Sequence, residues 1–244
     1  MGVDEAILHA VADGRSPPTL RFYRWSPPCV TIGYFQSMEA EVDLEACRAA
    51  GVGAIRRLTG GGAVFHDAEV TYSVVVPEGG PLSPPDILES YRRICAGLVE
   101  GLAELGIEAA FSPINDIAVG GKKVSGNAQT RKSGCLLQHG TVLMAVDLER
   151  MFSVLKVPSE KLKGKLIEGA KARVTSLGAI LGREVAYEET VRALVAGFSR
   201  AWGRSPSLPE GIVLAPGELS DRESEEARGL AAGRFSDPAW NMKR

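Results

Sequence analysis

The stretch RRLTGGGAVFHD, residues 56–67, places three consecutive glycines between an arginine pair and a His-Asp pair. Glycine loses more conformational freedom on folding than any other residue, so three in a row are costly in an ordinary turn. Such a run indicates a loop whose backbone approaches a bound group closely. The spacing matches neither GxxxxGK[ST] nor GxGxxG, which excludes a P-loop and a dinucleotide-binding fingerprint.

The two arginines before this loop are candidate anion ligands. Backbone N–H groups of a glycine-rich turn can bind an anion, and the guanidinium groups of Arg56 and Arg57 suit a phosphate or a carboxylate. Because side chains alternate along a strand, only one of the two can face the ligand. A tight hairpin with exposed arginines is the simpler interpretation, but it leaves the glycine triplet unexplained.

Two further clusters follow along the chain. NDIAVGGKKVSGNAQ (115–129) has the composition of a β-hairpin that turns at its Gly-Gly pair and carries two lysines. A lysine on a strand beside small residues can place its ammonium on a phosphate, and a solvated basic turn is the alternative. QHGTVLM (138–144) contains His139, which like His66 stands in a glycine-bearing motif. A lone strand histidine is more often a hydrogen-bonded structural residue than a catalyst.

The order of expected elements predicts an α+β fold with a mixed, largely antiparallel sheet flanked by helices. Strands come first, long helices come between and after them, and no βαβ alternation occurs. We expect strands at 19–25, 29–36, 53–58, 68–77 and within 115–144, and helices at 4–13, 43–51, 85–106, 147–157, 184–203 and 223–233. Residues 159–172 are lysine-rich without a clear period. One catalytic domain is expected over 1–244, without a separate C-terminal accessory domain, and 204–215 is the best candidate for a linker.

Composition narrows the function classes. The 244 residues include 28 Lys and Arg and 30 Asp and Glu, so the chain lacks the basic excess of a nucleic-acid binder. There is no uncharged apolar run of about 18 residues for a membrane span, and no basic N-terminal region for a signal peptide. The four cysteines form no CxxC pair, which argues against a zinc site and a disulfide framework. We therefore expect a soluble cytoplasmic protein that binds neither nucleic acid nor membrane.

Together the clusters resemble the lipoate-protein ligase A family. They are also similar to its relatives in the biotin/lipoate protein ligase superfamily, the cysteine-dependent octanoyltransferases and the biotin ligases. The matching segments are DEAIL (4–8), RRLTGGGAVFHDAEVTYSVV (56–75), PINDIAVGGKKVSGNAQ (113–129), LLQHGTVLMAVDLERM (136–151), RVTSLG (173–178) and FSDPAWN (235–241). The most specific part is Arg-Arg-x-Thr-Gly-Gly-Gly followed by Gly-Lys-Lys-x-Ser-Gly.

The resemblance implies a lipoate-protein ligase, which would activate lipoate or octanoate with ATP and Mg²⁺ to acyl-AMP. The acyl group would then pass to a lysine of a lipoyl domain of a 2-oxoacid dehydrogenase, or of glycine-cleavage H protein. Lys123 matches the family's catalytic lysine, which contacts the acyl carbonyl and the phosphate. The positions that match substrate- or adenylate-binding residues are Arg57, Thr59, Gly60, Gly61, Gly62, His66, Asn115, Asp116, Ser125, Gly126, His139 and Gly140. Asp116 is also a candidate Mg²⁺ ligand, and the two histidines are expected to support loops by hydrogen bonds.

One residue type separates ligase from transferase. The cysteine-dependent octanoyltransferases form a thioester on a cysteine in the loop before the Gly-Lys-Lys strand. Here that loop, AAFSPIND (109–116), has no cysteine, which favours adenylation. The alternative is an octanoyltransferase that moves octanoyl from acyl carrier protein to lipoyl domains, for which Cys135 beside Arg131 and Lys132 is a possible nucleophile. A small apolar strand residue is the simpler interpretation of Cys135.

The chain could also act without catalysis, as a lipoate-binding protein or as a scaffold subunit of a lipoylation complex. The strand that precedes the family's first helix is missing, so the true start could lie upstream of Met1. No accessory domain follows Trp240, which leaves open a need for a separate accessory ligase subunit. The biotin ligases' Gly-Arg-Gly-Arg loop is missing, so biotin is the least expected substrate, and residues 161–171 resemble the family's adenylate-covering loop.

Overall fold

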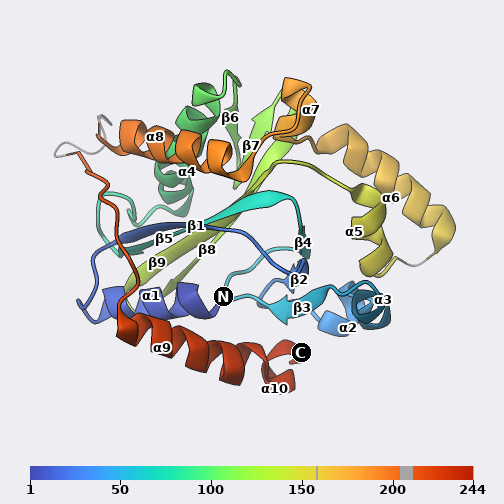
Figure 1. Cartoon of the computed structure of the whole chain (residues 1–244), viewed down its shortest axis with the longest axis horizontal. Helices are drawn as coiled ribbons and strands as arrows, with labels where there is room; N and C mark the ends of the chain where they lie inside the picture. Colours follow the sequence, from blue (N-terminus) through green and yellow to red (C-terminus); the bar gives the residue numbers. More distant parts are fainter. Residues whose placement is uncertain (158, 204–210, 244) are drawn as a thin grey trace.

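The computed structural model describes residues 1–157, 159–203 and 211–243, and its main element is a six-stranded antiparallel sheet (Figure 1). The strand order is β1-β5-β9-β8-β7-β6. The strands are β1 (Thr19–Tyr23), β5 (Glu69–Pro77), β9 (Cys135–Leu143), β8 (Lys122–Lys132), β7 (Asp116–Val119) and β6 (Ala110–Ser112). The predicted hairpin is β7–β8, with a register shift between Ile117 and Ala118. The predicted fold class is confirmed.

A second, three-stranded sheet carries the glycine loop. It contains β3 (Gly53–Arg56), β2 (Cys29–Ile32) and β4 (Val64–His66), and β2 pairs parallel with β3 and antiparallel with β4. The loop of residues 57–63 therefore joins β3 to β4 across β2. Helices α2 (Met38–Glu41) and α3 (Leu44–Ala49) lie beside this sheet (Figure 1).

Helices α4 (Ile87–Glu104) and α8 (Tyr187–Gly203) cover one face of the main sheet (Figure 1). Ile94 and Leu98 of α4 and Phe198 of α8 are fully buried against the strands. The two helix backbones touch, because a Cβ atom at Gly197 would lie 2.0 Å from the backbone nitrogen of Gly101. This face is a continuous hydrophobic core and leaves the opposite face for a ligand.

Helices α1 (Gly2–Ala12) and α9 (Asp221–Leu230) cover part of the opposite face. Ile7 and Leu8 of α1 pack against Val75 of β5 and Leu137 of β9. Helix α9 starts with a capping box at Ser220 and packs outside α1, and a π-helical turn, η1 (Ala231–Phe235), leads to α10 (Pro238–Asn241). The C-terminal segment thereby returns to the glycine-loop sheet (Figure 1).

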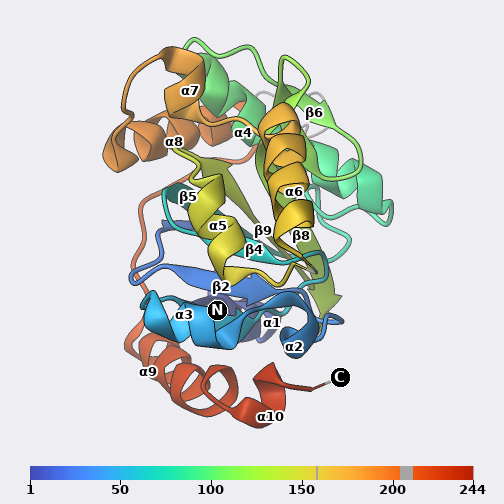
Figure 2. The same ribbon diagram turned by 90° about the vertical axis from the view of Figure 1, so that its right-hand side faces the viewer.

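The remaining three helices follow β9 in the described part of the chain, and one of them corrects a prediction. Helices α5 (Leu148–Val154), α6 (Glu160–Arg173) and α7 (Leu177–Leu181) follow β9 (Figure 2). The lysine-rich stretch forms the helix α6, although its apolar residues do not recur with a helical period. The reason is that α6 is mostly exposed and buries only Ile167 and Ala170 among its described side chains, so tertiary contacts demand no apolar stripe. Residues 204–210 of the predicted linker lie outside the described residues.

No helix in the described part of the chain combines the length and apolar character that crossing a lipid bilayer requires.

Candidate functional site

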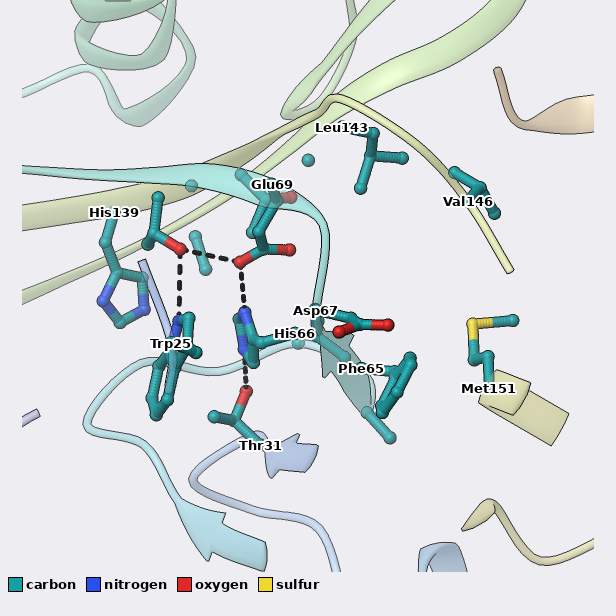
Figure 3. A pocket seen from close by; sticks show the side chains of 18 of the residues that line it. Trp25, Thr31, Phe65, His66, Asp67, Glu69, His139, Leu143, Val146 and Met151 are labelled. Carbon is teal, nitrogen blue, oxygen red and sulfur yellow. Dashed lines mark hydrogen bonds and ion pairs between the residues drawn. The ribbon is translucent and has the colours of Figure 1, made fainter. Parts of the chain in front are cut away.

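A cavity of about 490 Å³ opens between the face of the main sheet not covered by α4 and α8, strand β4 and helix α5. Figure 3 shows an apolar wall of this cavity facing a polar wall built around His66 and Glu69. The apolar wall consists of Val64, Phe65, Leu143, Val146, Leu148 and Met151. The combination suits a ligand with a hydrocarbon chain and a polar end.

Arg57 is the centre of the polar wall. Its buried guanidinium donates from Nη1 to the carbonyl oxygen and to Oγ1 of Thr31, from Nε to Thr59 Oγ1, and from Nη2 to the carbonyl of Gly60 at 2.7 Å. No carboxylate among the described residues forms an ion pair with it, and burial lowers the pKa of Arg57 to about 10. Gly61 has φ +98°, and a Cβ atom there would lie 2.7 Å from Nη2. The middle glycine of the triplet therefore admits the arginine.

His66 extends this network on one side. Its Nε2 lies 2.9 Å from Thr31 Oγ1, which already accepts from Arg57, so we assign the threonine proton to the imidazole nitrogen. The other nitrogen, Nδ1, then donates to Glu69 Oε1 at 2.5 Å. The indole of Trp25 stacks on the imidazole with ring centroids 4.5 Å apart. His66 is thus held in one orientation and one tautomer.

His139 extends the network on the other side. Its Nε2 lies 2.7 Å from Thr59 Oγ1, and its Nδ1 lies 3.5 Å from Asp4 Oδ2. Burial lowers the pKa of His139 against the opposite effect of Asp4, so the ring is neutral at pH 7. Burial would raise the pKa of Asp4, but the Arg21 guanidinium at 2.6 Å holds that pKa well below its usual value. A carboxylate therefore ends the network on each side, Glu69 beyond His66 and Asp4 beyond His139.

Lys123 brings a second cation to the cavity from β8. Its Nζ lies 2.7 Å from Asp116 Oδ1, and its side chain is 41% exposed. A Cβ atom at Gly126 would lie 2.5 Å from this Nζ, so the glycine of the Gly-Lys-Lys-x-Ser-Gly motif lets the lysine lie across β8. Lys123 is therefore an accessible, oriented ammonium at the polar end of the cavity.

Asn115 anchors the loop before β7 to this strand. Its Nδ2 donates to the carbonyl of Asn127, and Asn127 Nδ2 donates back to the carbonyl of Asn115 at 2.8 Å. Asn127 Oδ1 also accepts from the buried Tyr72 hydroxyl at 2.6 Å. A Cβ atom at Gly140 would lie 2.1 Å from this Oδ1, so the glycine makes room for the amide.

The predicted site residues divide into three groups. Those that line the cavity are Arg57, Gly61, Gly62, His66, Asn115, Lys123, Gly126, His139 and Gly140. Thr59, Gly60 and Asp116 are not part of the lining and contact Arg57 or Lys123 instead. Ser125 is fully buried and lies outside the lining.

The cysteines lie away from the cavity. Cys135 is 1% exposed and packs with Ile7 and Leu137 between α1 and the main sheet. Burial raises the pKa of its thiol, and it raises the pKa values of the Cys29 and Cys95 thiols to about 12. None of the four cysteines lines the cavity within the described residues. Cys135 is therefore not placed to act as a nucleophile, because it lies in this core and not at the cavity.

Arg56 has a different task from Arg57. Its fully buried guanidinium donates to the carbonyls of Gly33, Tyr34 and Gln36, and also to those of Trp240, Asn241 and Lys243. The strand alternation predicted that only one of the two arginines faces the ligand, and the structure places Arg57 at the cavity. Arg56 joins the C-terminal segment to the loop after β2.

Three polar-wall residues were absent from the predicted site: Trp25, Thr31 and Glu69. They belong to the segment before β2, to β2 and to β5, so only the pairing of strands brings them together. Glu69 had a detectable signal, because it is an acidic residue at the start of the apolar run EVTYSVVVP. A charged residue buried at such a position is costly unless it is paired or functional.

The model for the lipoyl protein ligase A/B catalytic domain matches residues 1–199 of this chain. The chain belongs to this family. Among solved structures of similar fold is the bi-partite lipoate protein ligase of Thermoplasma acidophilum, with a TM-score of 0.84 and 33% identity over 99% of this chain and 89% of that one. A lipoate-protein ligase A bound with ATP has a TM-score of 0.79 and 32% identity, over 99% of this chain and 92% of that one.

Curated relatives in the lipoyl protein ligase A/B family correct the predicted activity. The octanoyltransferase LipM of Symbiobacterium thermophilum is 42% identical over 100% of this chain and 93% of its own length. The LipM of Geobacillus kaustophilus is 38% identical with the same coverage. The prediction of an ATP-dependent lipoate ligase is therefore wrong, and the relatives favour the octanoyltransferase. The ligase prediction rested on the absence of a cysteine from residues 109–116, and this single absence did not outweigh the similarity of the whole chain to the octanoyltransferases.

The predicted Mg²⁺ ligand finds no support in the geometry. Asp116 Oδ1 contacts the Lys123 ammonium at 2.7 Å, and the described residues contain no group of three or more His, Cys, Asp or Glu side chains arranged for a metal ion. An ammonium in contact with this oxygen competes with a cation there. No residue of the site is therefore assigned to Mg²⁺.

Proposed function

We propose that this chain is an octanoyltransferase, which moves an octanoyl group from acyl carrier protein to a lysine of lipoyl domains. The observation that carries the proposal is the cavity, in which the apolar wall faces a polar end that carries the accessible ammonium of Lys123. The octanoyl chain would lie on the apolar wall and its carbonyl would lie near this ammonium. The LipM relatives, which match the whole chain, support the same activity.

The chemistry fits the charges at the site. A thioester is already activated, so its transfer to an amine needs no ATP. Attack on the carbonyl places negative charge on the carbonyl oxygen, and a preoriented ammonium stabilises that charge as it develops. Lys123 has this role in the proposal. Arg57 is held by four hydrogen bonds to Thr31, Thr59 and Gly60, and it would keep the glycine backbone in contact with the bound group.

The test uses purified protein, octanoyl-acyl carrier protein and a lipoyl domain, without ATP. We expect octanoylation of one lysine of the lipoyl domain, detected by intact-protein mass spectrometry and located by peptide mapping. Transfer only from free octanoate or lipoate with ATP would reject the proposal. If neither donor is used, addition of a candidate accessory subunit tests the partner predicted from the sequence.

A further inference from the structure

Helix α6 and the residues just before it carry a concentration of positive charge. Residues 156–173 contain six Lys or Arg residues and two Glu, in a chain that has 28 basic and 30 acidic residues. Glu168 pairs with Lys171 at 2.8 Å, whereas the exposed ammonium groups of Lys156 and Lys165 have no carboxylate partner among the described residues. The segment therefore presents a positive surface on an otherwise acidic molecule.

Packing within the fold does not account for the exposed side of α6. The helix buries only Ile167 and Ala170 among its described side chains, and Leu162 is 37% exposed. A helix that is polar nearly all round is stabilised by charge pairs along its own surface or lies between two bodies. Lys165 forms no such pair with a described residue, so the side of α6 that carries it is suited to a partner.

The positive surface continues into a hollow. This hollow of about 520 Å³ lies between α5, α6 and the segment that joins α2 to α3, and its lining includes Lys156 and Lys163. The lining carboxylate, Asp43, already accepts the backbone N–H groups of Glu45 and Ala46 as the cap of α3. Two lysines on a concave surface favour an anionic group there.

The C-terminal end of α6 is joined directly to the polar end of the cavity. Val174, which follows the helix, lines the cavity, and the backbone N–H of Thr175 donates to the Lys123 carbonyl at 2.8 Å. From there α6 extends to the right-hand end of the molecule in Figure 1, over about 21 Å for its 14 residues. Lys165 lies about 12 Å along this axis from Arg173. A protein body on α6 is therefore separated from a group held at Lys123 by a distance that a linking arm must span.

Resting on the proposed function, we propose that α6, with Lys156 and Lys165, docks an acidic surface of the carrier protein that delivers the octanoyl thioester. A carrier protein holds its thioester on a phosphopantetheine arm, which is much longer than a lysine side chain. Its body can therefore rest on α6 while the thioester reaches Lys123. The acceptor domain presents its lysine directly, so it docks closer to the cavity. Opposite charges on the two surfaces steer the carrier, and Leu162 supplies an apolar contact among them.

The first test measures binding alone. Lys156→Glu/Lys165→Glu is compared with wild type and with Arg92→Glu/Arg192→Glu, which makes the same change in net charge at exposed positions of α4 and α8. Fluorescently labelled holo-acyl carrier protein is titrated at low ionic strength, and its anisotropy is recorded. We expect the α6 variant to bind at least about tenfold more weakly, because like charges then face each other across the interface. The control should bind as wild type does, and added salt should weaken wild type more than the α6 variant.

Steady-state transfer then separates the donor from the acceptor. We expect kcat/KM for octanoyl-acyl carrier protein to fall at least about tenfold in the α6 variant, with kcat within about twofold of wild type. The value of kcat/KM for the lipoyl domain should not change. Lys156→Gln/Lys165→Gln, which removes the two charges without adding acidic ones, should show a smaller loss of the same kind. Circular dichroism checks that each variant is folded.

The other outcomes overturn the docking surface or the proposed function, and they are distinguishable. Wild type that does not bind the carrier protein, or an α6 variant with unchanged binding and kinetics, would show that α6 is a solvated surface. A loss confined to the lipoyl domain would assign α6 to the acceptor, and an equal loss for both substrates would contradict a donor site. If wild type binds the carrier protein through α6 but transfers no octanoyl group, the proposed function fails and the docking surface stands.

Discussion

Lys123 is the residue whose role can be tested most directly, because Lys122 provides a control beside it. Lys123→Met retains the length of the side chain and removes its charge. We expect kcat/KM for octanoyl transfer to fall about 100- to 1,000-fold, the usual cost of losing one oxyanion-stabilising donor. Lys122→Met should have little effect, since that ammonium lies 3.4 Å from the Lys171 carbonyl on the surface. Equal activities of the two variants would exclude Lys123 from the chemistry.

His139 makes stability depend on pH. Its pKa is lowered in the folded protein, so the unfolded chain binds more protons below the ordinary histidine value of about 6.5. The neutral ring therefore makes its full contribution to the free energy of unfolding above that pH. This contribution decreases as the pH falls, by up to about 1.4 kcal/mol per pH unit. Denaturant unfolding at pH 7.5 and 5.5 should show a smaller loss for His139→Gln than for wild type. Equal losses would contradict this account.

At the scale of elements, Arg56 ties the C-terminal segment to the glycine-loop sheet. Arg56→Lys would leave several of its six carbonyl acceptors without a donor, because lysine cannot reproduce the planar guanidinium. We expect a loss of roughly 3 kcal/mol or more in unfolding free energy, from about 1–3 kcal/mol for each unsatisfied buried group. Arg48→Lys on the exposed side of α3 is the control.

The hydrogen bonds of Arg56 also predict energetic coupling between Arg56 and Trp240 of α10. The Trp240 indole donates to the Arg56 carbonyl at 3.0 Å, and its own carbonyl accepts from Arg56 Nε at 3.0 Å. Trp240→Ala and Arg56→Lys should therefore be non-additive by about 0.5–3 kcal/mol in a double-mutant cycle. Additive losses would mean that the segment docks independently of Arg56.

At the scale of the whole molecule, the cavity depends on both sheets and α5 together. Met151 of α5 belongs to the apolar wall, where we place the octanoyl chain. Met151→Ala lengthens that space, so the ratio of kcat/KM for decanoyl to octanoyl donors should rise about tenfold, since one or two methylenes in a pocket are worth about 1–3 kcal/mol. Phe152→Ala, at a position outside the lining, should leave the ratio unchanged. A ratio unaffected by Met151→Ala would place the acyl chain elsewhere.

The sequence by itself determined the class of the fold and the loops of the site. Strand and helix patterns are local, so they predicted α1, β5, α4 and α8, and the glycine triplet marked the loop around Arg57. The two motifs also indicated an acyl site. Local pattern failed at α6, because an exposed helix needs no apolar stripe, and the motifs could not separate ligase from transferase.

Only the tertiary structure decided which side chains meet. Strand pairing brings Thr31, Glu69 and His139 to one wall, and it removes Cys135 into the core between α1 and the sheet. It also assigns Arg57 to the cavity and Arg56 to the C-terminal segment. Thr31 and His66 are 35 residues apart in the chain, and Arg56 and Asn241 are 185 residues apart. The physical reason is that burial and hydrogen-bond partners belong to the packed molecule, and no local pattern contains them.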